Sequence, residues 1–79
     1  MKIQVKLLAT YREYLPTGIT GNTHNTKTEK GATAVSVLTQ YGVPTDGSSV
    51  VLVNGRTPNP DQRLQEGDVV CAFPAIAGG

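Results

Sequence analysis

The segment TAVSVLTQYGVP, residues 33–44, carries the clearest structural signal in the chain. Thr33 is a suitable N-cap for a helix, Gly42 stands where a C-terminal glycine belongs, and Pro44 prevents the helix from continuing. The apolar residues between them recur at the i, i+3, i+4 and i+7 spacing of one helix face: Ala34, Val37, Leu38 and Tyr41.

Apolar strands are predicted on both sides of this helix. Residues 2–9 alternate, with Ile3, Val5 and Leu7 on one face and polar side chains on the other. Residues 50–53 form a second apolar strand that ends at Asn54-Gly55, a dipeptide typical of tight hairpin turns. A last strand covers residues 69–73, a helical turn is expected at residues 64–68, and a short polar edge strand near residues 25–29.

One helix and four or five strands in so short a chain predict an α+β fold of two layers. The helix covers one face of a mixed sheet, which is the β-grasp arrangement of ubiquitin-like domains. A small OB-type barrel is less favoured, because the polar middle of the chain does not supply a fifth long strand. We expect a β-grasp domain over residues 1–74 and a flexible tail over residues 75–79.

The composition excludes several classes of protein. The 79 residues suffice for one small domain, and a net charge of +1 does not suggest a nucleic-acid binder. A single cysteine cannot form an intramolecular disulfide, and no metal site is expected. No run approaches the length of a membrane span and the start is not a signal peptide, so a cytoplasmic location away from membranes is expected.

Catalytic pairs of side chains are missing from the sequence. His24 has Asn and Thr neighbours and is expected to be a solvated loop histidine. Cys71 lies in an apolar strand without flanking cations, which favours a small apolar filler over a reactive thiol. The chain is therefore expected not to be an enzyme and to bind no cofactor.

The remaining chemical feature is the diglycine Gly78-Gly79 at the end of the sequence. One interpretation is a frayed end, since termini are commonly disordered. In the other, the carboxylate of Gly79 is the reactive group. Residues without a Cβ, together with Ala77 and Ile76, would let it enter a narrow channel in a partner.

Residues 1–15, 31–42 and 51–79 resemble the MoaD/ThiS family of ubiquitin-like sulfur carriers, and most closely the MoaD branch, the small subunit of molybdopterin synthase. Residues 17–30 depart from the family pattern, which usually has an apolar second strand. The motifs that carry the resemblance are Leu7-Leu8-Ala9 before Arg12-Glu13, Ala32-Thr33-Ala34 with Leu38, Val53-Asn54, Leu64-x-Glu66-Gly67-Asp68-x-Val70, and Phe73-Pro74-Ala75-Ile76-Ala77-Gly78-Gly79.

The resemblance implies a carrier whose chemistry is supplied by partners. An E1-like enzyme would use ATP to convert the Gly79 carboxylate into an acyl-adenylate. A persulfide donor would then supply sulfur and leave a thiocarboxylate. That group would deliver sulfur to a pterin precursor held by a synthase large subunit, so acyl-adenylate and thiocarboxylate would be transient modifications.

A docking surface is expected on the sheet face opposite the helix. Strand alternation places Leu8, Val69, Cys71 and Phe73 there if the helix covers the side of Ile3. The resemblance implies that carriers of this family bind partners through an apolar patch beside the tail. In the alternative interpretation, Phe73 folds back over the edge of the core.

Other functions remain open at this level. The sulfur could be destined for the thiazole of thiamine or for another thiolation pathway. The same activated terminus could form isopeptides with lysines, as in a protein modifier. The chain could also be a plain β-grasp interaction module whose glycines are incidental.

Overall fold

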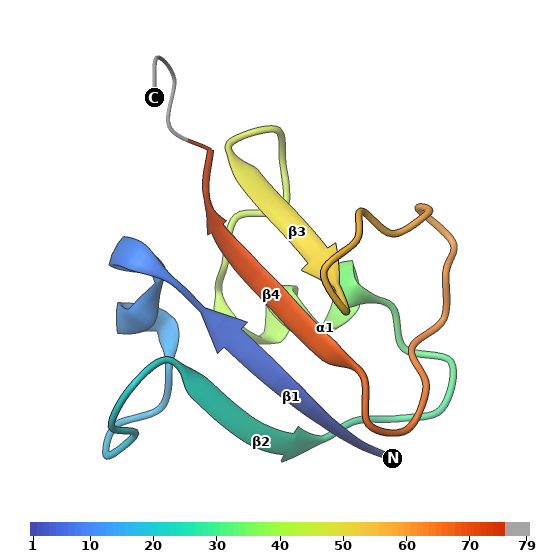
Figure 1. Ribbon diagram of the computed structural model, residues 1–79, viewed down its shortest axis with the longest axis horizontal. Coiled ribbons are helices and arrows are strands. Elements are labelled where there is room, and N and C mark those ends of the chain that lie inside the picture. The colour runs from blue at the N-terminus through green and yellow to red at the C-terminus, as the bar shows by residue number, and fades with distance from the viewer. Residues whose placement is uncertain (76–79) are drawn as a thin grey trace.

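The structure is a computed structural model that describes residues 1–75. These residues form four strands, one α-helix and one 3₁₀ helix, arranged as shown in Figure 1. In chain order the elements are β1 (Lys2–Leu7), η1 (Ala9–Tyr14), β2 (Thr23–Lys27), α1 (Ala34–Tyr41), β3 (Ser49–Val53) and β4 (Val69–Pro74).

The strands form one mixed sheet with the order β2-β1-β4-β3. The central pair, β1 and β4, is parallel, with Val5 opposite Val70 and Leu7 opposite Ala72. β2 is antiparallel to β1, and β3 is antiparallel to β4. This sheet with one covering helix confirms the predicted β-grasp fold, with four strands among the residues described.

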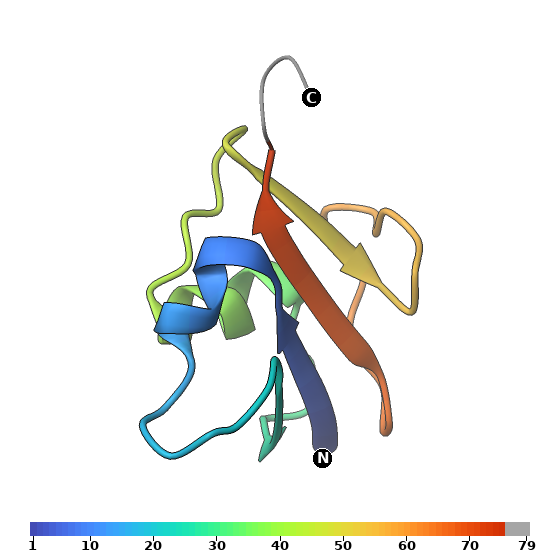
Figure 2. The same cartoon turned by 60° about the vertical axis from the view of Figure 1, so that its left-hand side comes forward.

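The helix α1 covers one face of the sheet and leaves the other face open, as Figures 1 and 2 show together. The apolar alternation of β1 points Ile3, Val5 and Leu7 toward the helix, and all three are buried. The other buried apolar residues are Tyr11, Ala34, Val37, Leu38, Val43, Val53, Leu64, Val70 and Ala72.

The ends of α1 are fixed by the residues that predicted them. The Thr33 hydroxyl accepts a hydrogen bond from the Ser36 backbone N–H, and the Ser36 hydroxyl oxygen accepts one from the Thr33 N–H. Gly42 has φ +85°, a left-handed conformation that favours glycine and closes the helix. The apolar face is confirmed as well, because Val37 and Leu38 are buried while Val35, on the outer side, is 48% exposed.

The first strand is shorter than predicted. β1 ends at Leu7, and the 3₁₀ helix η1 replaces the expected continuation to Ala9. The physical reason is the burial of Tyr11, which is 7% exposed and packs edge-on against Tyr14 with 5.4 Å between ring centroids. The turn into η1 places Ala9 at φ +53°.

His24 is not the solvated loop residue that the sequence predicted. It lies in β2, which starts at Thr23 rather than near Asn25, and its side chain points toward α1. There, 2.7 Å separates the His24 Nδ1 from the Tyr41 hydroxyl. The alternation of β2 turns His24 to the helix side, so the hydrogen bond ties the edge strand to the helix.

Of the two turns predicted at residues 54–55 and 64–68, the structure confirms the first and contradicts the second. The Asn54-Gly55 turn is confirmed, because both residues have positive φ and Val53 exchanges two backbone hydrogen bonds with Arg56. The helical turn expected at residues 64–68 is wrong. Instead, Gly67 at φ +85° allows a tight turn in which the Asp68 N–H donates to the Gln65 carbonyl.

We predict that Leu38→Ala lowers the free energy of unfolding by about 2–5 kcal/mol, because this side chain is fully buried between helix and sheet and its loss leaves a cavity. Urea unfolding followed by circular dichroism measures the change. Val35→Ala, on the exposed side of the same helix, is the matched control and should change stability by less than about 0.5 kcal/mol. Equal effects of the two substitutions would contradict the assigned helix face.

Candidate functional site

The open face of the sheet is the candidate site, and β4 is its central strand. Val70 and Ala72 are fully buried on the helix side, whereas Val69, Cys71 and Phe73 are half-buried. This alternation turns the latter three side chains to the open face. The structure thus places these three candidate docking residues together, on the face that the sequence predicted.

Leu8 joins this face at the end of β1. It has an extended backbone, with φ −106° and ψ 165°, and its N–H donates to the Ala72 carbonyl over 3.0 Å. Because it comes one position after the buried Leu7, the half-buried Leu8 side chain lies on the opposite face, beside Phe73.

Two residues of this face were missed by the sequence reasoning. Val50 pairs with Phe73 and Leu52 pairs with Cys71 across the β3–β4 ladder, so both lie on the open face. Both side chains are half-buried. Their signal was present in the sequence, since residues 50–53 are apolar at every position and such a strand exposes an apolar group on each face.

These side chains form a surface that we call the open-face patch. Among the described residues, the partly buried apolar side chains that pack against the core are Met1, Tyr14, Leu15, Ala32, Tyr41 and Val51, so the open-face patch is separate from the core. The members of the open-face patch are Leu8, Val50, Leu52, Val69, Cys71 and Phe73.

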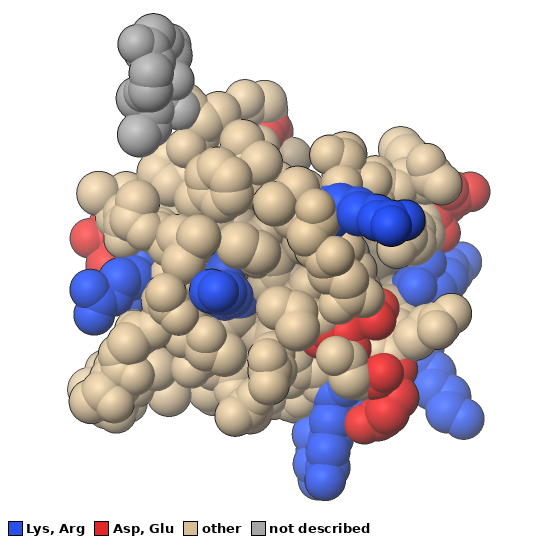
Figure 3. Space-filling model, viewed as in Figure 1, with Lys and Arg blue, Asp and Glu red and all other residues tan. Residues whose placement is uncertain are grey.

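Figure 3 looks onto this face of the molecule. Uncharged surface covers most of the area over the central strands, and charged side chains gather mainly toward the margins. The apolar side chains of the open-face patch are only half-buried, and apolar groups gathered at a surface in this way are costly to hydrate and are characteristic of a protein–protein contact. The face is therefore suited to binding another protein.

Cys71 is the titratable side chain of the open-face patch. Burial raises the pKa of its thiol, because a less hydrated environment disfavours the thiolate, and the positive charge of nearby Lys6 acts in the opposite direction. The burial effect is the larger one. Cys71 therefore stays protonated at neutral pH and serves as a small apolar group, in agreement with the sequence interpretation.

The described chain leaves the sheet beside the open-face patch. Pro74, the last residue of β4, pairs with Ser49, and the Ala75 N–H donates to the Ser48 carbonyl over 2.9 Å. The nearest open-face pair is Val50 with Phe73. Of the predicted tail, residues 75–79, only Ala75 is described, and the other four residues lie outside the described part of the chain: Ile76, Ala77, Gly78 and Gly79.

Two other types of site are absent from residues 1–75. No group of three or more His, Cys, Asp or Glu side chains in this range is arranged to hold a metal ion. In the same range, no helix has the length and apolar character required to traverse a bilayer.

The fold is shared with two solved structures. The putative molybdopterin converting factor, subunit 1, from Pyrococcus furiosus has a TM-score of 0.73 and 24% identity, over 95% of this chain and 98% of that one. SAMP1 from Haloferax volcanii also has a TM-score of 0.73 and 24% identity, and the match covers all of both chains. These similarities establish the ubiquitin-like fold.

Comparison with curated proteins gives no significant match. A family model described as Mut7-C ubiquitin, in contrast, matches residues 1–78, which is nearly the whole chain. This confirms the ubiquitin-like relationship that the sequence motifs indicated. The chain therefore belongs to the Mut7-C ubiquitin family.

Proposed function

We propose that this protein is a sulfur carrier whose Gly79 carboxylate is adenylated by an E1-like enzyme, converted into a thiocarboxylate and used as a sulfur source in molybdopterin biosynthesis. The ubiquitin-like fold is that of small carriers and modifiers. The similarity to the Pyrococcus furiosus protein, a putative molybdopterin converting factor subunit, favours the pterin pathway among the possible acceptors.

The observation that carries the proposal is the position of the open-face patch relative to the end of β4. Phe73 and Val50 form the last open-face pair before the chain leaves the sheet at Ala75. A partner that covers this pair also lies beside the point from which the segment toward Gly79 starts. Four extended residues reach about 14 Å, enough to enter a buried active site in that partner.

The proposed chemistry takes place on the terminal carboxyl group in three steps. A Gly79 carboxylate oxygen attacks the α-phosphorus of ATP and pyrophosphate leaves, which converts a poor acylating group into a mixed anhydride. A persulfide sulfur of the donor then attacks the carbonyl carbon and AMP leaves. This forms a C–S bond and gives an acyl disulfide that keeps the S–S bond of the persulfide. A second donor thiol then attacks the cysteine sulfur of that S–S bond, the thiocarboxylate leaves, and the two donor cysteines end as a disulfide.

All catalytic groups in this scheme belong to partners. The E1-like enzyme binds ATP, the persulfide donor supplies sulfur, and the synthase large subunit holds the pterin precursor. The contribution of this chain is recognition and reach. Gly78 and Gly79 lack a Cβ, so the reactive carboxyl group can approach a phosphate or a carbonyl closely in a narrow channel.

We predict that deletion of Gly79, or addition of one residue after it, abolishes activation without lowering the melting temperature. The full chain and the variant are each incubated with ATP, the E1-like enzyme and a persulfide donor, and intact mass spectrometry reports the product. The full chain should gain the mass of one oxygen replaced by sulfur. Normal ATP-dependent activation of the truncated variant would overturn the carrier proposal.

Three further measurements separate the carrier from the alternatives. A mass increase that corresponds to isopeptides with lysines would favour a protein modifier. Sulfur transfer from the thiocarboxylate to a thiazole precursor, and not to a pterin precursor, would keep the carrier but change its pathway. Unchanged function after removal of both terminal glycines would favour a plain interaction module.

We further predict that Phe73→Ala weakens binding to the activating enzyme by about 2 kcal/mol or more, as for a buried aromatic anchor. The fold should persist, because Phe73 packs on the open face and not in the core. Thermal melting and partner affinity are measured on the same variant, with Val35→Ala on the outer side of α1 as the control. Loss of stability with unchanged affinity of the folded fraction would show that Phe73 is a core residue.

A further inference from the structure

The open face changes in character along its strands. Next to the chain exit, a purely apolar row consists of Leu8, directly after β1, Phe73 on β4 and Val50 on β3. One row is about 7 Å from the next, since it is set two residues further along each strand. The second row holds Thr23, Lys6, Cys71 and Leu52, and the third holds Asn25, Gln4, Val69 and Asn54.

Lys6 stands out in the second row. It pairs with Cys71 in the parallel β1–β4 ladder and is half-buried, so its aliphatic stem lies against the open-face patch. Its positive charge also acts on the Cys71 thiol, in keeping with the pairing of the two residues in the ladder. A single cation therefore lies within the apolar part of the face, one row from Phe73.

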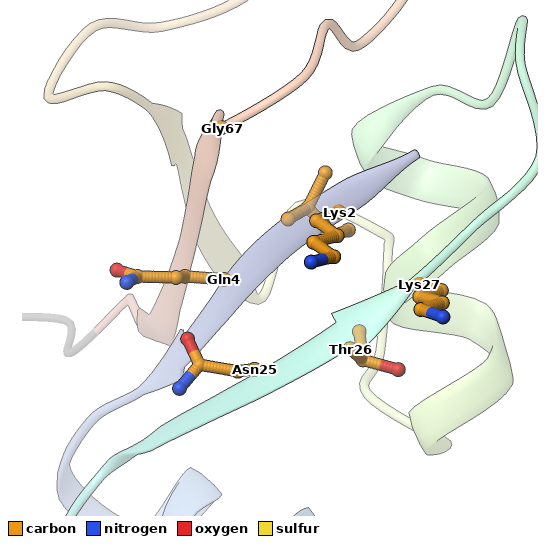
Figure 4. A pocket seen from close by; sticks show the side chains of 7 residues that line it. Lys2, Gln4, Asn25, Thr26, Lys27 and Gly67 are labelled. Carbon is orange, nitrogen blue, oxygen red and sulfur yellow. The ribbon is translucent and has the colours of Figure 1, made fainter.

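The far end of the face is polar and its charges are mixed. Lys2 and Lys27 lie opposite each other on β1 and β2, and with Gln4 and Asn25 they line a shallow groove of about 410 Å³ that is drawn in Figure 4. The carboxylate of Glu66 is close by, since it accepts hydrogen bonds from the Lys2 backbone N–H at 3.1 Å. This acid partly balances the lysines, so the far end presents no strong field of one sign.

Two acids that contact β1 and the β3–β4 connection, Glu66 and Asp68, already accept hydrogen bonds from other groups of the chain. Both Asp68 carboxylate oxygens are occupied, because they accept from the Asn54 side-chain amide and from the Gln65 backbone N–H. Glu66 is bound to the backbone of Lys2. The side chains that flank Lys6 within its row are Thr23 and Cys71, which are both uncharged at neutral pH.

A protein that covers the open-face patch removes water from the Lys6 ammonium group. If the cover were purely apolar, a cation would be left buried without a partner, which is strongly unfavourable. A carboxylate opposite Lys6 compensates for the lost hydration and adds a charge-assisted hydrogen bond. Charge complementarity therefore specifies the chemistry of the surface that fits here.

We propose that Lys6 is a specificity-determining residue of the docking face, and that the occupant of this face is an apolar surface of the activating enzyme that carries an acidic side chain opposite Lys6. This inference rests on the proposed function, which supplies the identity of that partner. A second copy of the chain fits less well. Within the rows of the open face that surround Lys6, which are residues 4–8, 23–25, 50–54 and 69–73, a second copy offers no carboxylate to pair with Lys6.

The decisive variant is Lys6→Met, because a partner surface with an acid and a purely apolar partner surface predict opposite changes in Kd. If the enzyme presents a carboxylate, methionine leaves that acid buried and unpaired, and Kd should rise about tenfold or more. If the cover is purely apolar, methionine removes an unfavourable buried charge and should tighten binding. Lys30→Met, with the same change of charge in the exposed connection between β2 and α1, is the matched control and should leave Kd unchanged.

The experiment measures binding of each variant to the purified E1-like enzyme of the same organism without ATP, at about 50 mM and 500 mM NaCl. High salt should weaken the binding of the unmodified chain more than that of Lys6→Met. Thermal melting confirms that the variant is folded, and Lys6→Arg should restore most of the affinity.

Unchanged or tighter binding of Lys6→Met would overturn the inference, and the proposed function would stand if the unmodified chain still forms the thiocarboxylate with this enzyme. Absence of both binding and activation of the unmodified chain would overturn the proposed function and this inference with it. A concentration-dependent dimer that Phe73→Ala abolishes would show that a second copy occupies the face, which also overturns the inference.

Discussion

The parallel contact between β1 and β4 is the constraint on which the rest of the structure depends. It joins the two ends of the described chain, with Val5 opposite Val70, and it is extended by the bonds from the Gln4 N–H to the Asp68 carbonyl and from the Leu8 N–H to the Ala72 carbonyl. Parallel neighbours require a long crossover connection, and α1 lies within that connection. The helix therefore packs on one face only, and the last strand lies in the centre of the sheet.

The central position of β4 links the fold to the candidate site. A central strand is flanked on both sides, so each of its open-face side chains gains neighbours from two strands, as Cys71 does from Lys6 on β1 and Leu52 on β3. The described chain leaves the sheet at the C-terminal end of this strand, where the Ala75 N–H is hydrogen-bonded to the Ser48 carbonyl. The open face and Ala75, where the described chain leaves the sheet, are thus adjacent because of one pairing, and no dedicated loop is needed to bring them together.

Features coded by neighbouring residues were predictable, and features that depend on distant contacts were not. Local capping at Thr33 and Gly42 fixed the helix ends, and alternation fixed which face of β4 is open. The 3₁₀ helix depends on Tyr11, whose hydroxyl lies 2.7 Å from the Ser49 hydroxyl, a contact between residues 38 apart. The orientation of the His24 side chain depends likewise on its contact with Tyr41, 17 residues away. The place of Val50 on the open face depends on the β3–β4 register, which no local pattern specifies.

The distribution of apolar and charged groups on the open face bears on the orientation that this domain would take on a partner. The hydrophobic contact proposed for Phe73 and its row would be non-directional, so by itself it would leave a docked domain free to rotate about the contact. The charge pair proposed at Lys6, one row or about 7 Å away along β1, would add a second and direction-dependent contact. Two contacts at different rows fix the rotation of the domain on its partner. Because the Ala75 backbone is held to Ser48, fixing that rotation also fixes the direction in which the chain departs from the sheet. Neither Phe73 nor Lys6 is part of the core, so substitutions there can change the orientation of the docked domain while the fold remains intact.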